Sequence, residues 1–379
     1  MKKKFLGVFL VGAAMLTISG CKDESFNENI PEYNVKRVLD GYDSSSLVKA
    51  TNYMKNMDSL ITNKENVVYS PVSFYSAIAS YSLFSEYEEN LVKALGYESD
   101  SAVKDDILKL NKALTFQDSD TYKASIATAV SLPKNYKVKD EARKTLNELS
   151  IGLFADDSKD VDEWYKKATF EMEDKLPFKI KDSIALTSTY SYVHKYTEAY
   201  NKENVDFNGK KVEGISDTSS NMNYLINDDY TSIVIPSGKE KMVITMPNND
   251  SYQYDTKEIV ERNYETGYVH FEIPMFNVQT KESLNTFVKG QLGLTYLYNK
   301  PAFTKLVDNN ENPVGEFLQS TNFKFTNEGI SGASVTSIIT PTSPLNPPKK
   351  VNITINKPFY FTLLDSANVT LFAGYVKTI

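Results

Sequence analysis

The stretch from Phe323 to Ser343 constrains the fold more than any other part of the sequence. Phe323 and Phe325 alternate with polar neighbours, which is typical of a half-buried strand, and Asn327-Glu328-Gly329 has the composition of a turn. The ten residues 330–339 carry no charge and no proline and favour a strand in a narrow place in a sheet. Four prolines follow before residue 349 and favour an exposed loop. The pattern predicts a segment that can change between loop and strand.

The remainder of the chain has the composition of a globular protein. Of its 379 residues 41% are hydrophobic and 24% charged, which is enough to build a large core. Without Lys2, Lys3 and Lys4, 39 basic residues stand against 49 acidic ones, a net charge of −10. An acidic balance of this size argues against nucleic-acid binding. We find no internal repeat and no second domain boundary.

The first 20 residues predict a cleaved signal peptide. A basic start is followed by an apolar segment, Phe5 to Ile18, that is too short to span a bilayer comfortably. Ile18-Ser19-Gly20-Cys21 resembles the lipobox of bacterial lipoproteins, in which the cysteine is lipidated and becomes the new N-terminus. This resemblance implies a membrane anchor on Cys21 and location at the outer membrane. The alternative, a structural thiol in the core, is weaker because Cys21 is the only cysteine.

A tether is expected to follow the anchor. Residues 21–43 are mostly polar and predict a linker, and residues 44–379 the folded domain. Lys22-Asp23-Glu24 resembles the short acidic signal that sends such lipoproteins to the cell surface in Bacteroidota, although a plain solvated tether has the same composition. The mature chain has no disulfide, so its fold must rest on packing alone.

Hydrophobic periodicity places helices early in the chain and strands late. The expected helices are Ser44–Leu60, Ser73–Phe84, Val103–Leu114, Lys139–Leu149, Ser158–Leu176 and Lys281–Gly290. The expected strands are Asn66–Pro71, Ala124–Leu132, Ile184–Val193, Ser232–Pro236, Lys241–Pro247, Gly267–Phe276, Glu316–Phe325, Val351–Ile355, Phe359–Leu364 and Val369–Val376. Without a repeated strand–helix–strand unit, this order predicts an α+β domain built on large sheets.

Several segments, in this order and spacing, resemble the serpin family. They are Asn66–Tyr97, Val161–Trp164, Met242–Pro247, Ile273–Phe276, Asn356–Phe359 and Leu371–Val376. The resemblance implies a metastable fold with large mixed sheets, about eight or nine helices and an exposed reactive-centre loop. It also implies a monomer that inhibits a serine or cysteine protease through a covalent complex, the loop inserting into the main sheet after the protease cuts it.

The same resemblance places the hinge of that loop. The family's hinge pattern aligns with Asn327, Glu328, Gly329, Ile330, Ser331, Gly332, Ala333, Ser334, Val335 and Thr336. After insertion Ile330, Gly332, Ser334 and Thr336 would face inward, and three of these four side chains are small. The alternative is a protein of the same fold whose loop is inert.

The chain departs from the family at four positions. Ile330 replaces the usual threonine of the hinge, so a bulkier side chain is expected to slow insertion. Gln319, Ser188 and Tyr196 stand where histidine, asparagine and tryptophan are common. These three changes predict a weaker hydrogen-bond network beneath the sheet.

The family's spacing places the cut bond near residues 342–344. Bonds that precede proline resist most serine proteases, which leaves Thr342-Ser343 as the first choice and Leu345-Asn346 as the second. No arginine or lysine lies between the hinge and Lys349, so an elastase- or subtilisin-like protease is expected rather than a trypsin-like one.

An enzyme is the competing class. His194 and His270 are the only histidines, and the chain has no Gly-x-Ser-x-Gly elbow, no zinc-ligand spacing and no phosphate-binding glycine pattern. Both histidines lie in strand-like segments and are interpreted as sheet residues. We therefore predict no catalysis, no cofactor and no metal. The second hypothesis is a non-inhibitory lipoprotein of the same fold with a binding role.

Overall fold

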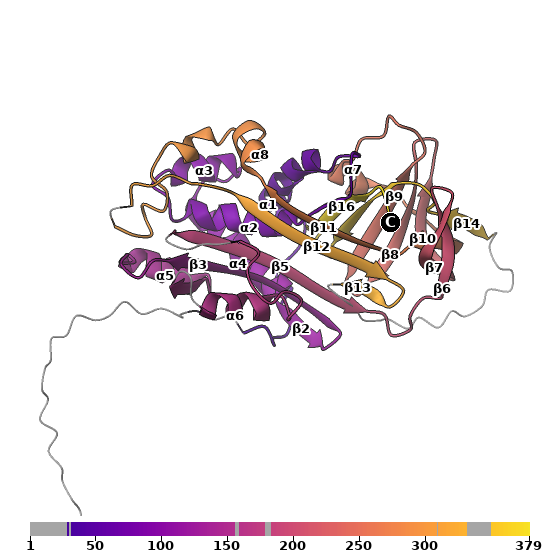
Figure 1. Ribbon diagram of the computed structural model, residues 1–379, viewed down its shortest axis with the longest axis horizontal. Helices are drawn as coiled ribbons and strands as arrows, with labels where there is room; N and C mark the ends of the chain where they lie inside the picture. The colour runs from indigo at the N-terminus through magenta and orange to yellow at the C-terminus, as the bar shows by residue number, and fades with distance from the viewer. Residues whose placement is uncertain (1–28, 30–31, 156–158, 179–182, 309, 332–349) are drawn as a thin grey trace, which may run out of the picture.

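The computed structural model describes residues 29, 32–155, 159–178, 183–308, 310–331 and 350–379. Within these residues the chain forms eight α-helices, two 3-10 helices and sixteen strands (Figure 1). The strands build a seven-stranded sheet, here sheet A, and a nine-stranded sheet, here sheet B. The predicted α+β architecture on large mixed sheets is confirmed.

Sheet A has the order β11-β12-β13-β5-β3-β2, with β4 on β3. Its strands are β2 Phe116–Ser119, β3 Tyr122–Leu132, β4 Gly152–Ala155, β5 Ala185–Lys195, β11 Phe276–Ser283, β12 Leu318–Thr326 and β13 Gly329–Ser331. The pairs are antiparallel except for β3 with β4. The short strand β13 is therefore the only link between the two halves of sheet A in the part of the chain that the structure describes.

Sheet B has the order β1-β16-β15-β9-β8-β7-β10-β14, with β6 on β7. Its strands are β1 Val67–Tyr69, β6 Lys202–Phe207, β7 Lys210–Ile226, β8 Tyr230–Ser237, β9 Glu240–Pro247, β10 Glu265–Pro274, β14 Val351–Thr354, β15 Phe359–Leu364 and β16 Thr370–Val376. The edge strand β14 runs parallel to β10. Because β13 belongs to sheet A and β14 to sheet B, residues 332–350 connect the two sheets.

Helices cover both faces of sheet A. The eight α-helices of the described chain are α1 Val48–Met54, α2 Pro71–Ser82, α3 Glu88–Ala94, α4 Asp100–Leu114, α5 Asp140–Glu148, α6 Lys159–Ala168, α7 Thr256–Glu261 and α8 Asn285–Gly290, with 3-10 helices η1 Lys55–Leu60 and η2 Thr295–Tyr298. Of these, α7 packs on sheet B. Ser70 caps α2, which is buried almost all round and lies beneath β5. The alternation of β3 shows the two faces, since Ile126 and Val130 join the main core whereas Ala127 and Ala129 pack with Trp164 of α6.

The main core lies between the two sheets. Phe323 of β12 stacks on Phe361 of β15 with ring centres 4.7 Å apart, and Phe276 of β11 lies 5.0 Å from the same ring. These aromatic contacts hold the β11–β12 half of sheet A against sheet B.

Part of the expected tether is packed against the domain. Residues 32–43, here the strap, form no helix or strand and end in a turn at Asp40 and Gly41. The exposure of residues 32–40 alternates, so that Tyr33, Val35, Arg37 and Leu39 are partly buried. Val35 accepts a backbone hydrogen bond from Gln117 of β2 at 2.7 Å. In the ranges the structure covers, no helix is long and apolar enough to cross a membrane.

Candidate functional site: the hinge and the slot in sheet A

A tight hairpin joins β12 to β13. The carbonyl groups of its turn residues Asn327 and Glu328 accept hydrogen bonds from the backbone of Tyr200 and Tyr196, both at 2.9 Å. The hydroxyl of Thr326 donates to the carbonyl of Gly329 at 3.2 Å. The turn predicted from Asn327-Glu328-Gly329 is present, and it leads the chain back into sheet A.

The first residues of the predicted hinge already lie inside sheet A. Ile330 pairs with Phe325 on one side and with His194 on the other, and its side chain is fully buried. Gly329 has a φ of +148°, and a Cβ there would lie 2.3 Å from the carbonyl oxygen of His194. Only glycine fits this approach. The bulk of Ile330 is therefore accommodated in the intact form, although its effect on the rate of insertion stays a prediction.

Below β13 the two halves of sheet A are separated by a slot. A cavity of about 940 Å³ lies there, lined by β5 residues between Ala185 and Tyr192 and by β12 residues between Leu318 and Lys324. Ser331 lies at its upper end. Over these lengths β5 and β12 have no sheet partner on the slot side among the described residues. Both strands thus present backbone donors and acceptors to an open gap.

The floor of the slot is the beginning of α2. The side chain of Gln319 on β12 donates to the carbonyl of Ser70 at 3.0 Å and accepts from its amide at 3.2 Å. The hydroxyl of Ser73 donates to the carbonyl of Ser188 on β5 at 3.0 Å. The strands β5 and β12, on the two sides of the slot, are therefore both hydrogen-bonded to the N-terminal end of α2.

The expected weakening of this network is only partly right. Gln319 makes two hydrogen bonds, so the prediction is wrong at that position, because an amide can donate and accept at once. The hydroxyls of Ser188 and Tyr196 are buried without a hydrogen bond, as predicted. Burial raises the pKa of Tyr196 well above its ordinary value, so its hydroxyl stays protonated at neutral pH.

A polar cluster, here the hinge support, lies behind β13. His194 Nδ1 hydrogen-bonds the hydroxyl of Ser237 at 2.6 Å, and Tyr192 donates to the Ser237 carbonyl at 2.8 Å. Tyr122 donates to Glu240 Oε2 at 2.7 Å. These residues come from β3 and β5 of sheet A and from the β8–β9 turn region of sheet B. The sequence analysis did not single out Ser237 or Glu240, because neither belongs to a recognisable motif.

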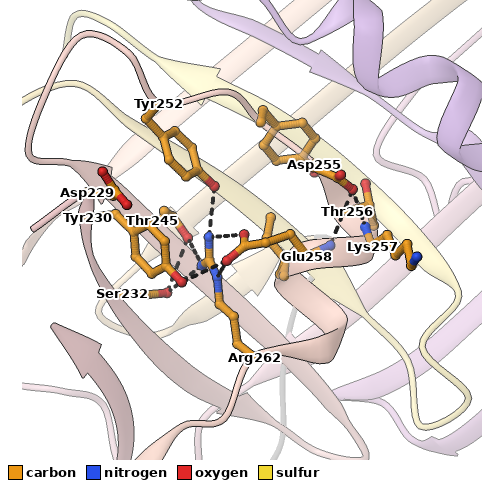
Figure 2. A network of polar contacts seen from close by, with 12 residues as sticks. Asp229, Tyr230, Ser232, Thr245, Tyr252, Asp255, Thr256, Lys257, Glu258 and Arg262 are labelled. Carbon is orange, nitrogen blue, oxygen red and sulfur yellow. Dashed lines mark hydrogen bonds and ion pairs between the residues drawn. The ribbon is translucent and has the colours of Figure 1, made fainter. Parts of the chain in front are cut away.

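A second polar cluster surrounds Arg262 after α7 (Figure 2). Its guanidinium lies over the ring of Tyr230, 3.9 Å from the ring centre, and donates to Glu258, Tyr252, Thr245 and Ser232. Each of these contacts is internal to sheet B and α7, and the charge of Arg262 is balanced by Glu258 at 2.6 Å. The cluster is a structural brace.

Both histidines of the chain lie in strands of the two sheets. His194 is buried against Ser237, and His270 on β10 hydrogen-bonds Thr218 at 3.1 Å, so both are sheet residues, as predicted. No group of three potential metal ligands is found within the described ranges.

The other predicted site residues lie outside the described residues. They are Cys21, the hinge residues Gly332, Ala333, Ser334, Val335 and Thr336, and the candidate cut bonds Thr342-Ser343 and Leu345-Asn346. The structure brings together only the first part of the hinge, Glu328 to Ser331, with the slot below it.

The fold and the slot can now be compared with known proteins. The family model described as "Serpin (serine protease inhibitor)" matches residues 49–378. The chain belongs to the serpin family. Its first 48 residues, which include the strap, precede the matched range.

Solved serpin structures share the fold. The thermophilic serpin tengpin in its native state aligns with a TM-score of 0.73 at 21% identity, covering 94% of this chain and 100% of that one. Serpin48 of the insect Tenebrio molitor aligns at 0.69 and 16%, covering 89% and 98%. Thyroxine-binding globulin in complex with thyroxine aligns at 0.69 and 15%, covering 86% and 98%. A sequence comparison with curated proteins finds no match. At these identities the likeness concerns the fold.

Proposed function

We propose that this serpin is a suicide inhibitor of serine proteases that traps its target by inserting the cut loop into the slot of sheet A. The observation that carries the proposal is the position of β13. Its three residues already form the top of a strand between β12 and β5, directly above the open gap. A strand that continues from Ser331 would fill that gap.

The pairing register supports this direction of insertion. Lys324 and Val193 both face Ser331, so the same register carries Gly332 to Phe323 and Tyr192. Two residues later it carries Ser334 to Thr321 and Tyr190, and then Thr336 to Gln319 and Ser188. Most of these neighbours are buried, so the small, uncharged inward side chains predicted for the hinge would face the buried side of the sheet.

The chemistry follows from this geometry. The catalytic serine of a protease attacks a loop carbonyl and forms an acyl ester, and the new amine departs with the C-terminal segment. Each residue of the loop that enters the slot exchanges hydrogen bonds with water for ladder bonds with β5 and β12. Insertion would move the acylated protease along sheet A before water can release it.

The proposal includes the target class and the location. The absence of basic residues before Lys349 supports an elastase- or subtilisin-like protease that cuts at Thr342-Ser343 or Leu345-Asn346. The lipobox-like sequence supports a lipid on Cys21 and location at the outer membrane, with the surface-facing side as the finer possibility.

Incubation with a panel of elastase-, subtilisin- and chymotrypsin-like proteases tests the function. We expect a denaturant-resistant covalent complex and a small C-terminal fragment whose mass gives the cut bond. The cleaved protein should melt at a higher temperature than the intact protein, because the inserted strand completes sheet A. Cleavage without complex, together with equal melting of both forms, would support the non-inhibitory hypothesis instead. A cut after Lys349 by the preferred protease would refute the specificity.

The location is tested separately. Wild-type protein should partition with membranes and be accessible to added protease on intact cells, whereas Cys21→Ala should be released or fail to mature. A wild-type protein found wholly in the soluble fraction would contradict the lipid anchor without affecting the inhibitor proposal.

A further inference from the structure

The strap places one buried charge at the hinge support. The guanidinium of Arg37 lies 2.6 Å from Glu240 Oε1, and the side chains of both residues are 1% exposed. Arg37 also donates to the carbonyl of Ala113 at 2.8 Å and to the hydroxyl of Tyr122 at 3.2 Å, and it lies over the ring of Phe116 at 4.5 Å. Among the ion pairs between described residues, this one has the most deeply buried side chains on both sides.

A continuous chain of contacts leads from this charge to β13. Glu240 accepts hydrogen bonds from Tyr122 at 2.7 Å and from Tyr192 at 3.2 Å. Tyr122 pairs with His194 across β3 and β5, and His194 pairs with Ile330 of β13. The ion pair therefore lies at the same level of sheet A as the seated part of the hinge.

The strap connects the two sheets at this level. Its contacts with Gln117, Phe116 and Tyr122 belong to the β2–β3 side of sheet A, whereas Glu240 begins β9 of sheet B. The strand β13 fits between β5 and β12 only if these two strands lie one strand spacing, about 4.8 Å, further apart than two directly paired strands. The upper ends of β3 and β5 must therefore stay away from β12. A fixed link between β3 and sheet B holds that separation.

Building on the proposed function, we propose that Arg37 is a positioning residue for loop insertion. It holds the upper ends of β3 and β5 where β13 can be seated, so that Gly332 is the next residue to enter the slot. The strap precedes the residues that match the family model, so this link is made by a segment outside the matched range. Loss of Arg37 leaves Glu240 buried without its cation, which forces the hinge support to rearrange.

The test compares two buried arginines. Arg37→Met and the milder Arg37→Lys remove the strap contact, and Arg262→Met removes an equally buried arginine side chain from the brace in sheet B. Amide hydrogen exchange at Ile330 and Ser331 reports whether β13 is seated. We expect exchange there to rise about tenfold or more in Arg37→Met, less in Arg37→Lys, and not selectively in Arg262→Met.

A second readout uses a target protease. The Arg37 variants should be cut at the same bond and form the acyl ester with the protease at the wild-type rate. A larger share of the variant molecules should, however, end as cleaved protein and not as covalent complex. If Arg37→Met does not fold, Arg37→Lys decides the question. Adding Glu240→Gln to Arg37→Met removes the unpaired charge but does not restore the link, so the fast exchange at β13 should persist.

Two results would overturn the inference. One is amide hydrogen exchange at β13 that is as slow in the Arg37 variants as in the wild type. The other is a rise in this exchange in Arg262→Met as large as that in Arg37→Met. If the wild type forms no complex with any protease, the proposed function fails, but the exchange experiment still tests the role of the strap because it needs no protease.

Discussion

Sheets A and B share an aromatic core but differ in how completely they are paired. Sheet B runs from β1 to β14 without a gap, and its middle strands carry large buried side chains such as Phe361 and Phe271. Sheet A is interrupted between β5 and β12, and many of the residues along that gap are small and hydroxylic, among them Ser188, Thr189 and Thr321. One sheet is complete, and the other lacks most of one strand.

This difference locates where the chain can change its structure. A closed ladder flanked by interlocked aromatic rings cannot take another strand without breaking existing bonds. Sheet A, whose gap is lined by serine and threonine, can gain hydrogen bonds, because each backbone group along the slot can acquire a partner. We therefore expect substitutions in sheet A to change what happens after cleavage, and substitutions in sheet B to change the stability of every form equally.

The largest effect is expected from a charge on the inward side of the hinge. Gly332→Glu would place a carboxylate between Phe323 and Tyr192 after insertion, an unpaired buried charge that costs on the order of 3–5 kcal/mol. The variant should be cut at the same bond, form little covalent complex and consume more inhibitor molecules per protease, as measured on denaturing gels. The matched control Ala333→Glu points to the other side of sheet A, between exposed Asn322 and buried Ser191, and should lose less inhibition than Gly332→Glu.

A similar energetic loss in sheet B should have the opposite pattern. Phe361→Ala removes a fully buried ring that contacts Phe276 and Phe323, at a cost of about 3–5 kcal/mol. Calorimetry should find the melting temperatures of the intact and the cleaved protein lowered alike. Leu318→Ala, at a side chain that is 40% exposed, should lower neither by much. If the melting temperature of the cleaved protein did not fall, the proposed difference in role between the two sheets would be contradicted.

Much of sheet B could be predicted from the sequence, because its inner strands carry strong apolar patterns. Phe359–Leu364 was predicted with the bounds that the structure gives to β15, and β8 and β9 differ by one or two residues at their ends. The long strand β7 was missed because most of its side chains are exposed or half-buried, so it lacks an apolar pattern although it pairs with β6, β8 and β10. The expected helix Lys281–Gly290 begins later than predicted: its first three residues belong to β11, since Lys281 and Glu282 pair with β12 and that pairing overrides their helical preference, and α8 covers Asn285–Gly290.

The site was predicted less completely than the fold. The turn before Gly329 and the inward position of Ile330 followed from the sequence, because turn chemistry and alternation are local properties. The strap was not predicted. Its alternating Tyr33, Val35, Arg37 and Leu39 were interpreted as part of a polar linker, since the partner of Arg37 lies about 200 residues later and no local pattern indicates it. Only the folded chain brings Arg37 to Glu240.

A moderate loss of stability is expected where Gln319 of β12 is hydrogen-bonded to the start of α2. Gln319→Ala removes two hydrogen bonds and leaves the buried amide of Ser70 without this acceptor, whereas the Ser70 carbonyl still accepts from Phe74, so the intact protein should lose about 1–3 kcal/mol. Chemical unfolding of the intact form measures this loss. Gln279→Ala on β11 is the control because its side chain is exposed. Equal stability of the two variants would mean that the link between β12 and α2 does not hold the open sheet in place.

The smallest effect concerns the second contact of the strap, which lies in sheet B. Tyr42 donates to Asp365 Oδ2, and the amides of Ala367 and Val369 donate to Oδ1 at 2.9 and 2.8 Å. Burial outweighs these donors and raises the pKa of Asp365 to about 6. The folded chain then keeps this proton to a higher pH than the unfolded chain, so the free energy of unfolding should fall as pH rises from about 4 to about 6. Asp365→Asn removes that titration, and its stability relative to wild type should rise across the same window and then level off. Paired unfolding curves of Asp365→Asn and wild type measure this difference, and a pH-independent difference would refute the titration.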